Sequence, residues 1–176
     1  EMIGHTLKTI SKTSYSPKSF NNKYGVPLSL FNLKQNDQFG VFEVGMDKRG
    51  EIDNLTKIIK PDLGIITNIS YAHAKNFNRI SQIAEAKAEI MNNIKKNGTV
   101  LLNMDDSFYN YHKNLAFKKK LKVISFGIKN KFSTTKLVKI KKIGNKYELF
   151  INVNGLYLSF YSLNDNQSHL YNILAT

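Results

Sequence analysis

Four short apolar runs, separated by segments of helical character, constrain the fold of this chain most. The runs are QFGVFEVG (38–45), LGIITNIS (63–70), TVLLN (99–103) and KVISFG (122–127). Each has the nearly continuous hydrophobicity of a strand that is buried on both faces. Helical periodicity recurs between the runs, most clearly over 80–97. This alternation predicts an α/β fold in which a mostly parallel sheet is flanked by helices.

The character of the sequence changes near residue 131. The segments KLVKIKKIG, KYELFINVNG and LYLSFYSL alternate apolar and polar residues with period two, and turn signals separate them at Gly144-Asn145 and Asn154-Gly155. We therefore predict an α/β core over 1–130, a small antiparallel β subdomain over 131–165 and the start of a helix over 166–176.

The composition limits the class of protein. The 176 residues contain no cysteine, which excludes disulfides and thiolate metal sites and fits a reducing cytoplasm. No apolar run approaches the roughly 18–20 residues that span a membrane. The net charge is +13, and residues 107–176 hold 12 lysines but only two acidic residues, Glu148 and Asp165. These lysines interleave with apolar residues, which favours a solvated face over a nucleic-acid reader.

Polar residues follow three of the predicted strands. They are Glu43 after the first, Thr67, Asn68 and His73 after the second, and Asn103, Asp105 and Asp106 after the third. If the strands are parallel, these groups meet at one sheet edge, where α/β proteins bind ligands. Each group also has a structural interpretation, because the glutamate could pair with a lysine and the aspartates could cap a helix. Together they favour a site, and carboxylate oxygens suit a divalent cation such as magnesium.

Lys87 is unusual within the predicted helix 80–97. Ile80, Ile83, Ala84, Met91 and Ile94 form an apolar stripe at helical spacing, and the lysine lies seven residues after the first of these. It could extend to the surface along its own methylene chain. Alternatively, it points inward for a chemical reason.

The order of the motifs resembles the central, ATP-binding domain of the Mur ligase family. The motifs are FNNKYGVPLSL, VFEVG, GEI, IITNIS, IAEAKAEI and LLNMDDSF, and they span about residues 15–110. The resemblance implies a fold like that of P-loop NTPases and an ATP-dependent amide ligation through an acyl phosphate. The motif wording favours the reaction that adds D-alanyl-D-alanine to UDP-N-acetylmuramoyl-tripeptide in peptidoglycan synthesis.

The resemblance also implies roles for particular residues. Lys87 would be carbamylated by carbon dioxide, because partial burial favours the neutral amine, and with Glu43 and His73 it would bind Mg²⁺. These three residues would form the catalytic centre. The resemblance assigns Asn21, Asn22, Thr67 and Asn68 to substrate binding, and Asn22, Asn103 and Asn172 to ATP. Asn172 matches the second asparagine of a family segment near the nucleotide, and His169 stands where the family has the first.

The sequence departs from the family in one important motif. No G-K-T or G-K-S phosphate loop is present, although family members carry one just before the segment that matches EMIGHTLKTI. We therefore expect residues 1–176 to be part of a central domain, with the N-terminal and C-terminal domains of the parent absent. By itself such a fragment would be inactive.

Other functions remain open at this stage. A different Mur ligase or a folylpolyglutamate synthase-like ligase would share these motifs, and a basic nucleic-acid-binding module is the alternative from another class. The resemblance favours a cytoplasmic monomer without a membrane span or a nucleic-acid partner.

Overall fold

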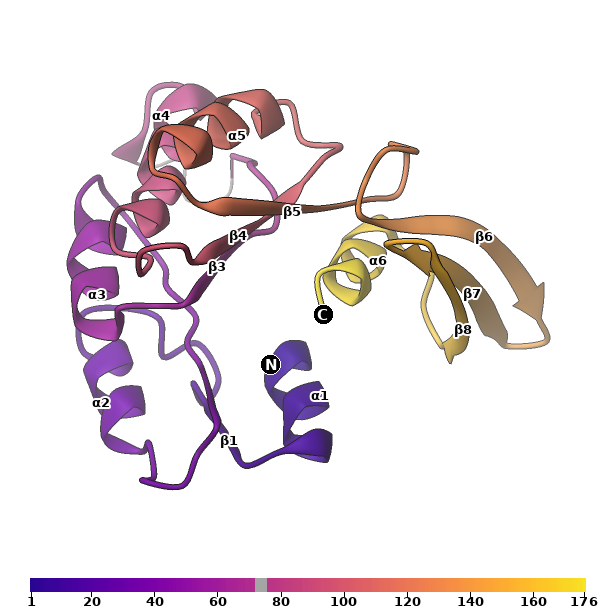
Figure 1. Cartoon of the computed structure of the whole chain (residues 1–176), viewed down its shortest axis with the longest axis horizontal. Helices are drawn as coiled ribbons and strands as arrows, with labels where there is room; N and C mark the ends of the chain where they lie inside the picture. The colour runs from indigo at the N-terminus through magenta and orange to yellow at the C-terminus, as the bar shows by residue number, and fades with distance from the viewer. Residues whose placement is uncertain (72–75) are drawn as a thin grey trace. The chain divides into compact units, whose positions relative to one another are not determined.

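The computed structural model describes residues 1–71 and 76–176 (Figure 1). The chain forms two compact units. One comprises residues 1–62, 70–98 and Thr176, and the other comprises 63–69 and 99–175. The fold is α/β, as predicted, and it contains both parallel and antiparallel strand pairs.

The first unit is mainly helical. Its helices are Met2–Ile10 (α1), Gly25–Phe31 (α2), Glu51–Ile59 (α3) and Ile80–Ala88 (α4), followed by a 3₁₀ turn at Glu89–Asn92 (η2). Helix α3 contacts α2, α4 and η2. Val26 and Ile83 are fully buried, and Ile52 and Met91 are nearly so. Ile83 and Met91, from the apolar stripe identified in the sequence, therefore lie in the core of this unit.

The predicted helix 80–97 is too long. Helix α4 ends at Ala88, and the 3₁₀ turn ends at Asn92. Beyond the turn, Lys95 N donates to Pro61 O at 2.9 Å, and Asn97 has a positive φ of 64°. The hydrogen bond to Pro61 and the left-handed conformation of Asn97 end the helix before Gly98, although the apolar periodicity of the sequence continues.

A two-stranded parallel sheet belongs to the same unit. It pairs Thr13–Tyr15 (β1) with Phe39–Val41 (β2), and α1 contacts both strands. The prediction of a buried strand over 38–45 is wrong in two respects. The strand has three residues, and Phe39 and Gly40 are exposed. Its only partner among the described strands is β1, so the residues after β2 do not share a sheet edge with those after the later strands.

The second unit contains a six-stranded sheet in the order β3-β4-β5-β6-β7-β8. The strands are Leu63–Ile66 (β3), Thr99–Asn103 (β4), Lys122–Gly127 (β5), Thr135–Ile143 (β6), Lys146–Val153 (β7) and Leu156–Ser162 (β8). Strands β3 to β6 pair in parallel, and β6 to β8 pair antiparallel. The antiparallel hairpins predicted from the turn signals are confirmed. They continue the parallel sheet because β6 pairs with the end of β5, Phe126 with Thr135.

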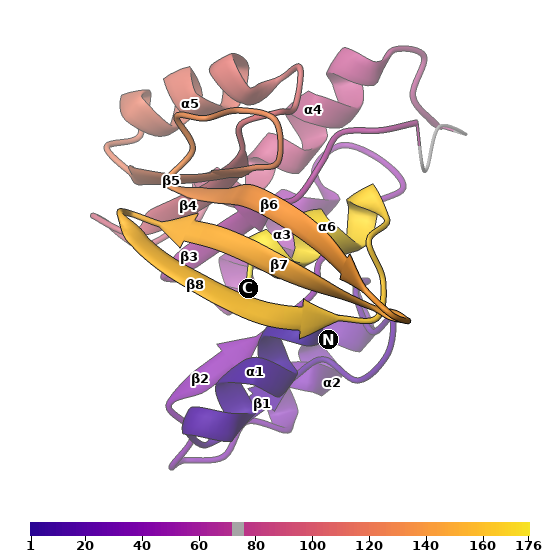
Figure 2. The same ribbon diagram turned by 90° about the vertical axis from the view of Figure 1, so that its right-hand side faces the viewer.

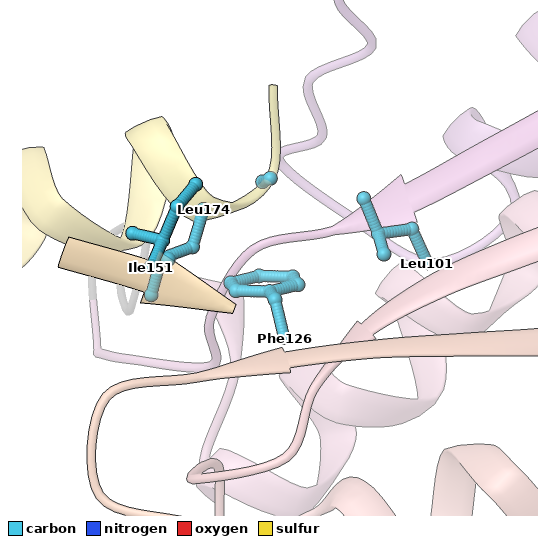
Figure 3. Close-up of a cluster of buried hydrophobic side chains, with 5 residues drawn as sticks. Leu101, Phe126, Ile151 and Leu174 are labelled. Carbon is cyan, nitrogen blue, oxygen red and sulfur yellow. The ribbon is translucent and has the colours of Figure 1, made fainter. Parts of the chain in front are cut away.

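Two helices complete the second unit, Tyr109–Lys118 (α5) and Gln167–Leu174 (α6). They lie on opposite sides of β5 (Figures 1 and 2). Phe126 is fully buried and packs with Leu101, Ile151 and Leu174 beneath α6 (Figure 3). The Tyr171 ring meets Phe126 edge-on, with the ring centroids 6.3 Å apart. This cluster joins the parallel and antiparallel parts of the sheet. Across the described residues, no helix has the length and apolarity needed to cross a membrane.

Candidate functional site

The residues predicted for the site are divided between the two units. The first unit holds Asn21, Asn22, Glu43 and Lys87, and the second holds Thr67, Asn68, Asn103 and Asn172. His73 lies outside the described residues.

Asn21 and Glu43 are brought together by the loop that precedes α2. Asn21 Nδ2 donates to Glu43 Oε1 at 2.8 Å, and Gly45 N donates to Asn21 O at 2.7 Å. A Cβ at Gly45 would lie 3.0 Å from the Asn21 side chain, so a glycine permits this close approach. Glu43 is exposed because it follows the short edge strand β2, and the expectation that it is buried is wrong. The hydrogen bond from Asn21 therefore holds the carboxylate of Glu43 in position while the carboxylate stays accessible to solvent.

Asn22 has a local structural role. Its Oδ1 accepts hydrogen bonds from Tyr24 N and Gly25 N, both at 3.0 Å, and its carbonyl accepts one from Val26 N at 2.9 Å. These bonds satisfy amides at the start of α2, as N-terminal capping side chains do. Asn22 therefore shapes the loop that presents Asn21. Its role in binding stays a prediction.

Lys87 lies one residue before the end of α4. Its side chain is half-buried, whereas Glu85 on the same helix is exposed. Ala84, Ala86 and Ala88 around it are nearly or fully buried. The side chain of Lys87 therefore lies partly inside this unit, among buried alanines.

Glu89, two residues after Lys87, is a residue to which we assigned no role from the sequence. Its Oε1 accepts from Gly50 N at 2.7 Å, and its Oε2 accepts from Asp53 N at 3.2 Å. The carboxylate thus caps the N-terminus of α3, where negative charge is favoured. It also connects the segment carrying Lys87 to the chain that follows Glu43. The motif IAEAKAEI contains this glutamate, but its partners are 36 and 39 residues away.

A second set of contacts strengthens the same junction. Asp53 Oδ1 accepts from Asn92 Nδ2 at 2.9 Å and from Asn93 Nδ2 at 3.1 Å, and Lys57 Nζ lies 2.6 Å from Asp53 Oδ2. The hydrogen bond from Lys57, followed by that from Asn92, holds the pKa of Asp53 below its usual value. The start of α3 and the η2 turn are therefore joined by several polar contacts.

In the second unit, Thr67 and Asn103 meet after neighbouring parallel strands. Asn103 Nδ2 donates to Thr67 O at 3.0 Å, and its Oδ1 accepts from Asp105 N at 3.0 Å. Asn103 is only 4% exposed, while Asn68 is exposed. The prediction that the second and third strand ends lie together is confirmed for β3 and β4. The amide of Asn103 connects these strand ends.

Asp105 and Asp106 have structural partners. Asp105 accepts hydrogen bonds from Ile128 N, Lys129 N and Asn130 N at 2.6–2.9 Å and from the Tyr171 hydroxyl at 3.1 Å. Asp106 accepts from Ile69 N at 2.7 Å and Phe108 N at 2.8 Å. The structural interpretation of this pair is therefore supported. Burial, with the nearby carboxylate of Asp105, raises the pKa of Tyr171.

Helix α6 carries Asn172 and His169. Asn172 is exposed. His169 N donates to Asn166 Oδ1 at 2.8 Å, which caps the helix, and His169 Nε2 lies 3.2 Å from Ser162 Oγ. His169, which stands where the family has its first asparagine, thus connects α6 to Ser162 at the end of β8.

No cluster of three His, Cys, Asp or Glu side chains that could hold a metal ion occurs among residues 1–71 and 76–176. Glu43 does have the right donor chemistry, since its exposed carboxylate is hydrogen-bonded within this part of the chain only through Oε1. A carbamate on Lys87 would add oxygen ligands that a count of native side chains omits.

The chain belongs to the Mur ligase family, because the sequence profile of the Mur ligase middle domain matches residues 1–176. It is 36% identical over 143 residues to the UDP-N-acetylmuramoyl-tripeptide–D-alanyl-D-alanine ligase of Rickettsia prowazekii (strain Madrid E), covering 80% of this chain and 31% of that protein. The chain thus spans about a third of the length of this relative.

Solved structures agree with this assignment. A crystal structure of MurF from Acinetobacter baumannii has a TM-score of 0.90 and 25% identity, with 99% of this chain and 37% of that chain covered. MurF from Thermotoga maritima, solved in complex with ADP, has a TM-score of 0.85 and 23% identity, with 99% and 40% covered.

Proposed function

We propose that this chain is the central domain of an ATP-dependent ligase that adds D-alanyl-D-alanine to UDP-N-acetylmuramoyl-tripeptide. The observation that carries the proposal is the 36% identity to a relative with that activity in its name, over 80% of this chain. The likeness to the A. baumannii MurF structure over nearly the whole chain supports it. The ADP in the T. maritima MurF structure fits ATP as the phosphoryl donor.

The reaction joins two substrates through an activated carboxylate. The terminal carboxylate of the tripeptide attacks the γ-phosphorus of ATP, and ADP leaves with the electrons of the broken P–O bond. The amino group of D-alanyl-D-alanine then attacks the acyl carbon, loses a proton and expels inorganic phosphate. Such phosphoryl transfer depends mainly on positioning and on neutralising phosphate charge.

The polar groups of this chain would position these substrates. Asn21 is held against Glu43 and Gly45, so its loop has a defined conformation before substrate arrives. We assign Asn21 and Asn22 to the substrates. Thr67 and Asn68 after β3 are assigned to the same task, and Asn22, Asn103 and Asn172 to the nucleotide.

Glu43, His73 and a carbamate on Lys87 would hold magnesium. The ammonium group of Lys87 would first lose a proton, and the neutral amine would then attack carbon dioxide. A C–N bond forms and a second proton is lost, so that a cation becomes an anionic oxygen donor. The half-buried position of Lys87 and the exposed carboxylate of Glu43 are compatible with these roles. When bound, the ion would supply positive charge against the phosphates.

Location and assembly form part of the same proposal. We place the ligase in the cytoplasm as a monomer. The absence of cysteine fits a reducing compartment.

A substrate-omission assay on the complete ligase tests the proposal. Phosphate release should require ATP, UDP-N-acetylmuramoyl-tripeptide and D-alanyl-D-alanine together. The alternatives are distinguished by changing both substrates, to UDP-N-acetylmuramoyl-L-alanyl-D-glutamate with lysine or diaminopimelate, or to a folate with glutamate. Phosphate release with one of these amino acids, but not with the dipeptide, would instead indicate another Mur ligase or a folylpolyglutamate synthase-like enzyme.

A further inference from the structure

The antiparallel strands β6 to β8 have one face that α6 does not cover. Leu137, Ile151 and Phe160 point to the α6 side, where they pack with the Phe126 cluster. Since side chains alternate along a strand, the intervening residues lie on the opposite face. Figure 2 shows the three strands in front of α6, so this outer face is turned toward the viewer.

The strand register places lysines and aromatic rings on the outer face in three rows. The rows are Lys136–Asn152–Tyr157, Lys139–Phe150–Ser159 and Lys141–Glu148–Tyr161, each read across β6, β7 and β8. We call these nine residues the outer face. Its β6 side is basic, and its β7 and β8 positions carry three aromatic rings.

The aromatic side chains are accessible. Tyr157 is 72% exposed, Tyr161 is 63% exposed, and Phe150 is half-buried between them. Tyr157 and Tyr161 are four residues apart on one strand, or about 13 Å. Phe150 is opposite Ser159 and therefore diagonal to both tyrosines, at roughly 7–8 Å. Three rings at this spacing can each receive one unstacked base.

The lysines provide the complementary charge. Lys139 and Lys141 are exposed and form no ion pair within the described part of the chain, and Lys136 is half-buried beside them. They lie on the strand next to β7, so a backbone that followed β6 would place its bases over the rings. Phosphates on lysine and bases on aromatic rings are the contacts by which sheet surfaces hold single strands.

We propose that the outer face binds single-stranded nucleic acid. In the sequence, the lysines interleaved with apolar residues favour a solvated face over a nucleic-acid reader, and the strand register changes that interpretation. The strand register places Phe160 on the α6 side of the sheet. It places Phe150, Tyr157 and Tyr161 together on the outer face. The polar side chains of Glu148 and Ser159 between the rings suit base edges better than a lipid surface. This inference is independent of the proposed ligase activity.

Fluorescence anisotropy with a labelled oligothymidylate tests the proposal. We expect micromolar binding that weakens about tenfold between about 50 and 200 mM salt, as two or three phosphate contacts require. The double variant Tyr157→Ser/Tyr161→Ser should bind at least about fivefold more weakly. Tyr157→Phe/Tyr161→Phe keeps both rings and should bind like the wild type.

Matched lysine variants separate this face from the general positive charge. Lys139→Gln/Lys141→Gln should weaken binding and flatten the salt dependence, whereas Lys118→Gln/Lys119→Gln, at the end of α5, removes the same charge and should change little. Equal effects of the two pairs, undiminished binding by the serine variant, or binding of anionic vesicles without oligonucleotide binding would overturn the proposal. Circular dichroism verifies that each variant is folded.

Discussion

Replacing Glu89 tests whether its carboxylate joins the lysine-bearing segment to α3. The carboxylate accepts hydrogen bonds from Gly50 N at 2.7 Å and Asp53 N at 3.2 Å. Glu89→Ala leaves these two amides at the helix N-terminus without their acceptor. Glu89→Gln keeps one neutral oxygen, which can accept only one of these two hydrogen bonds.

The magnitude follows from the two bonds. Loss of a helix cap costs about 1 kcal/mol, and hydrogen bonds to a charged group contribute about 1.5–3 kcal/mol. Because the site is partly exposed, water can replace some of the lost bonding. We therefore expect the free energy of unfolding to fall by about 2 kcal/mol for Glu89→Ala and by about half as much for Glu89→Gln. The melting temperature of a chain of this size should fall by about 4–8 °C for the alanine variant.

Urea unfolding followed by circular dichroism measures this effect, and Glu85→Gln is the matched control. Glu85 is on α4, which ends one residue before Glu89, and its carboxylate pairs with Arg49 at the surface, with both side chains about half exposed. Such pairs contribute about 0–1 kcal/mol. If Glu89→Ala destabilised the protein no more than Glu85→Gln, the cap would not join these segments.

Four further predictions address the core, the pH dependence and the site. Phe126→Ala should lower the free energy of unfolding in urea by about 3–5 kcal/mol. Phe132→Ala, at a position that is 88% exposed, should lower it little. Similar losses for the two variants would refute the proposed core. The pKa of Asp53 is lowered in the folded state, so its carboxylate contributes stability that is present above about pH 4 and is lost as the pH falls through the folded-state pKa. Asp53→Asn should therefore make the free energy of unfolding less dependent on pH in this acid range. An unchanged pH dependence would contradict this. Lys87→Ala should abolish most ligase activity and a ¹³C carbamate signal, with partial recovery of activity on adding a short carboxylate; normal turnover would remove the carbamate. Glu43→Gln should shift the magnesium titration of activity to higher concentration, and an unchanged titration would remove Glu43 as a ligand.

The central strands could be predicted from the sequence because local hydrophobicity determines them. TVLLN and KVISFG are continuous apolar runs bounded by turn residues, and β4 and β5 have the predicted limits. Strand β1 was missed because Thr13–Tyr15 has no apolar pattern, and it exists only through its pairing with β2. The link between β5 and β6 likewise depends on only two residue pairs, Phe126 with Thr135 and Gly127 with Lys136.

The environment of the predicted site residues could not be derived from the sequence. Glu43 was expected inside a buried strand, but β2 lies at an edge and ends at Val41. Its contact with Asn21 joins residues 22 positions apart, which periodicity cannot predict. Glu89 shows the same limitation, since the motif contains it but its two amide partners come from a distant loop.

The most direct test of the account is formation of the amide product by the complete ligase. Mass spectrometry should detect UDP-N-acetylmuramoyl-pentapeptide when ATP, the tripeptide precursor and D-alanyl-D-alanine are present, with one phosphate released for each product molecule. Absence of the pentapeptide under these conditions, with a folded protein and with magnesium and bicarbonate supplied, would contradict the proposed function.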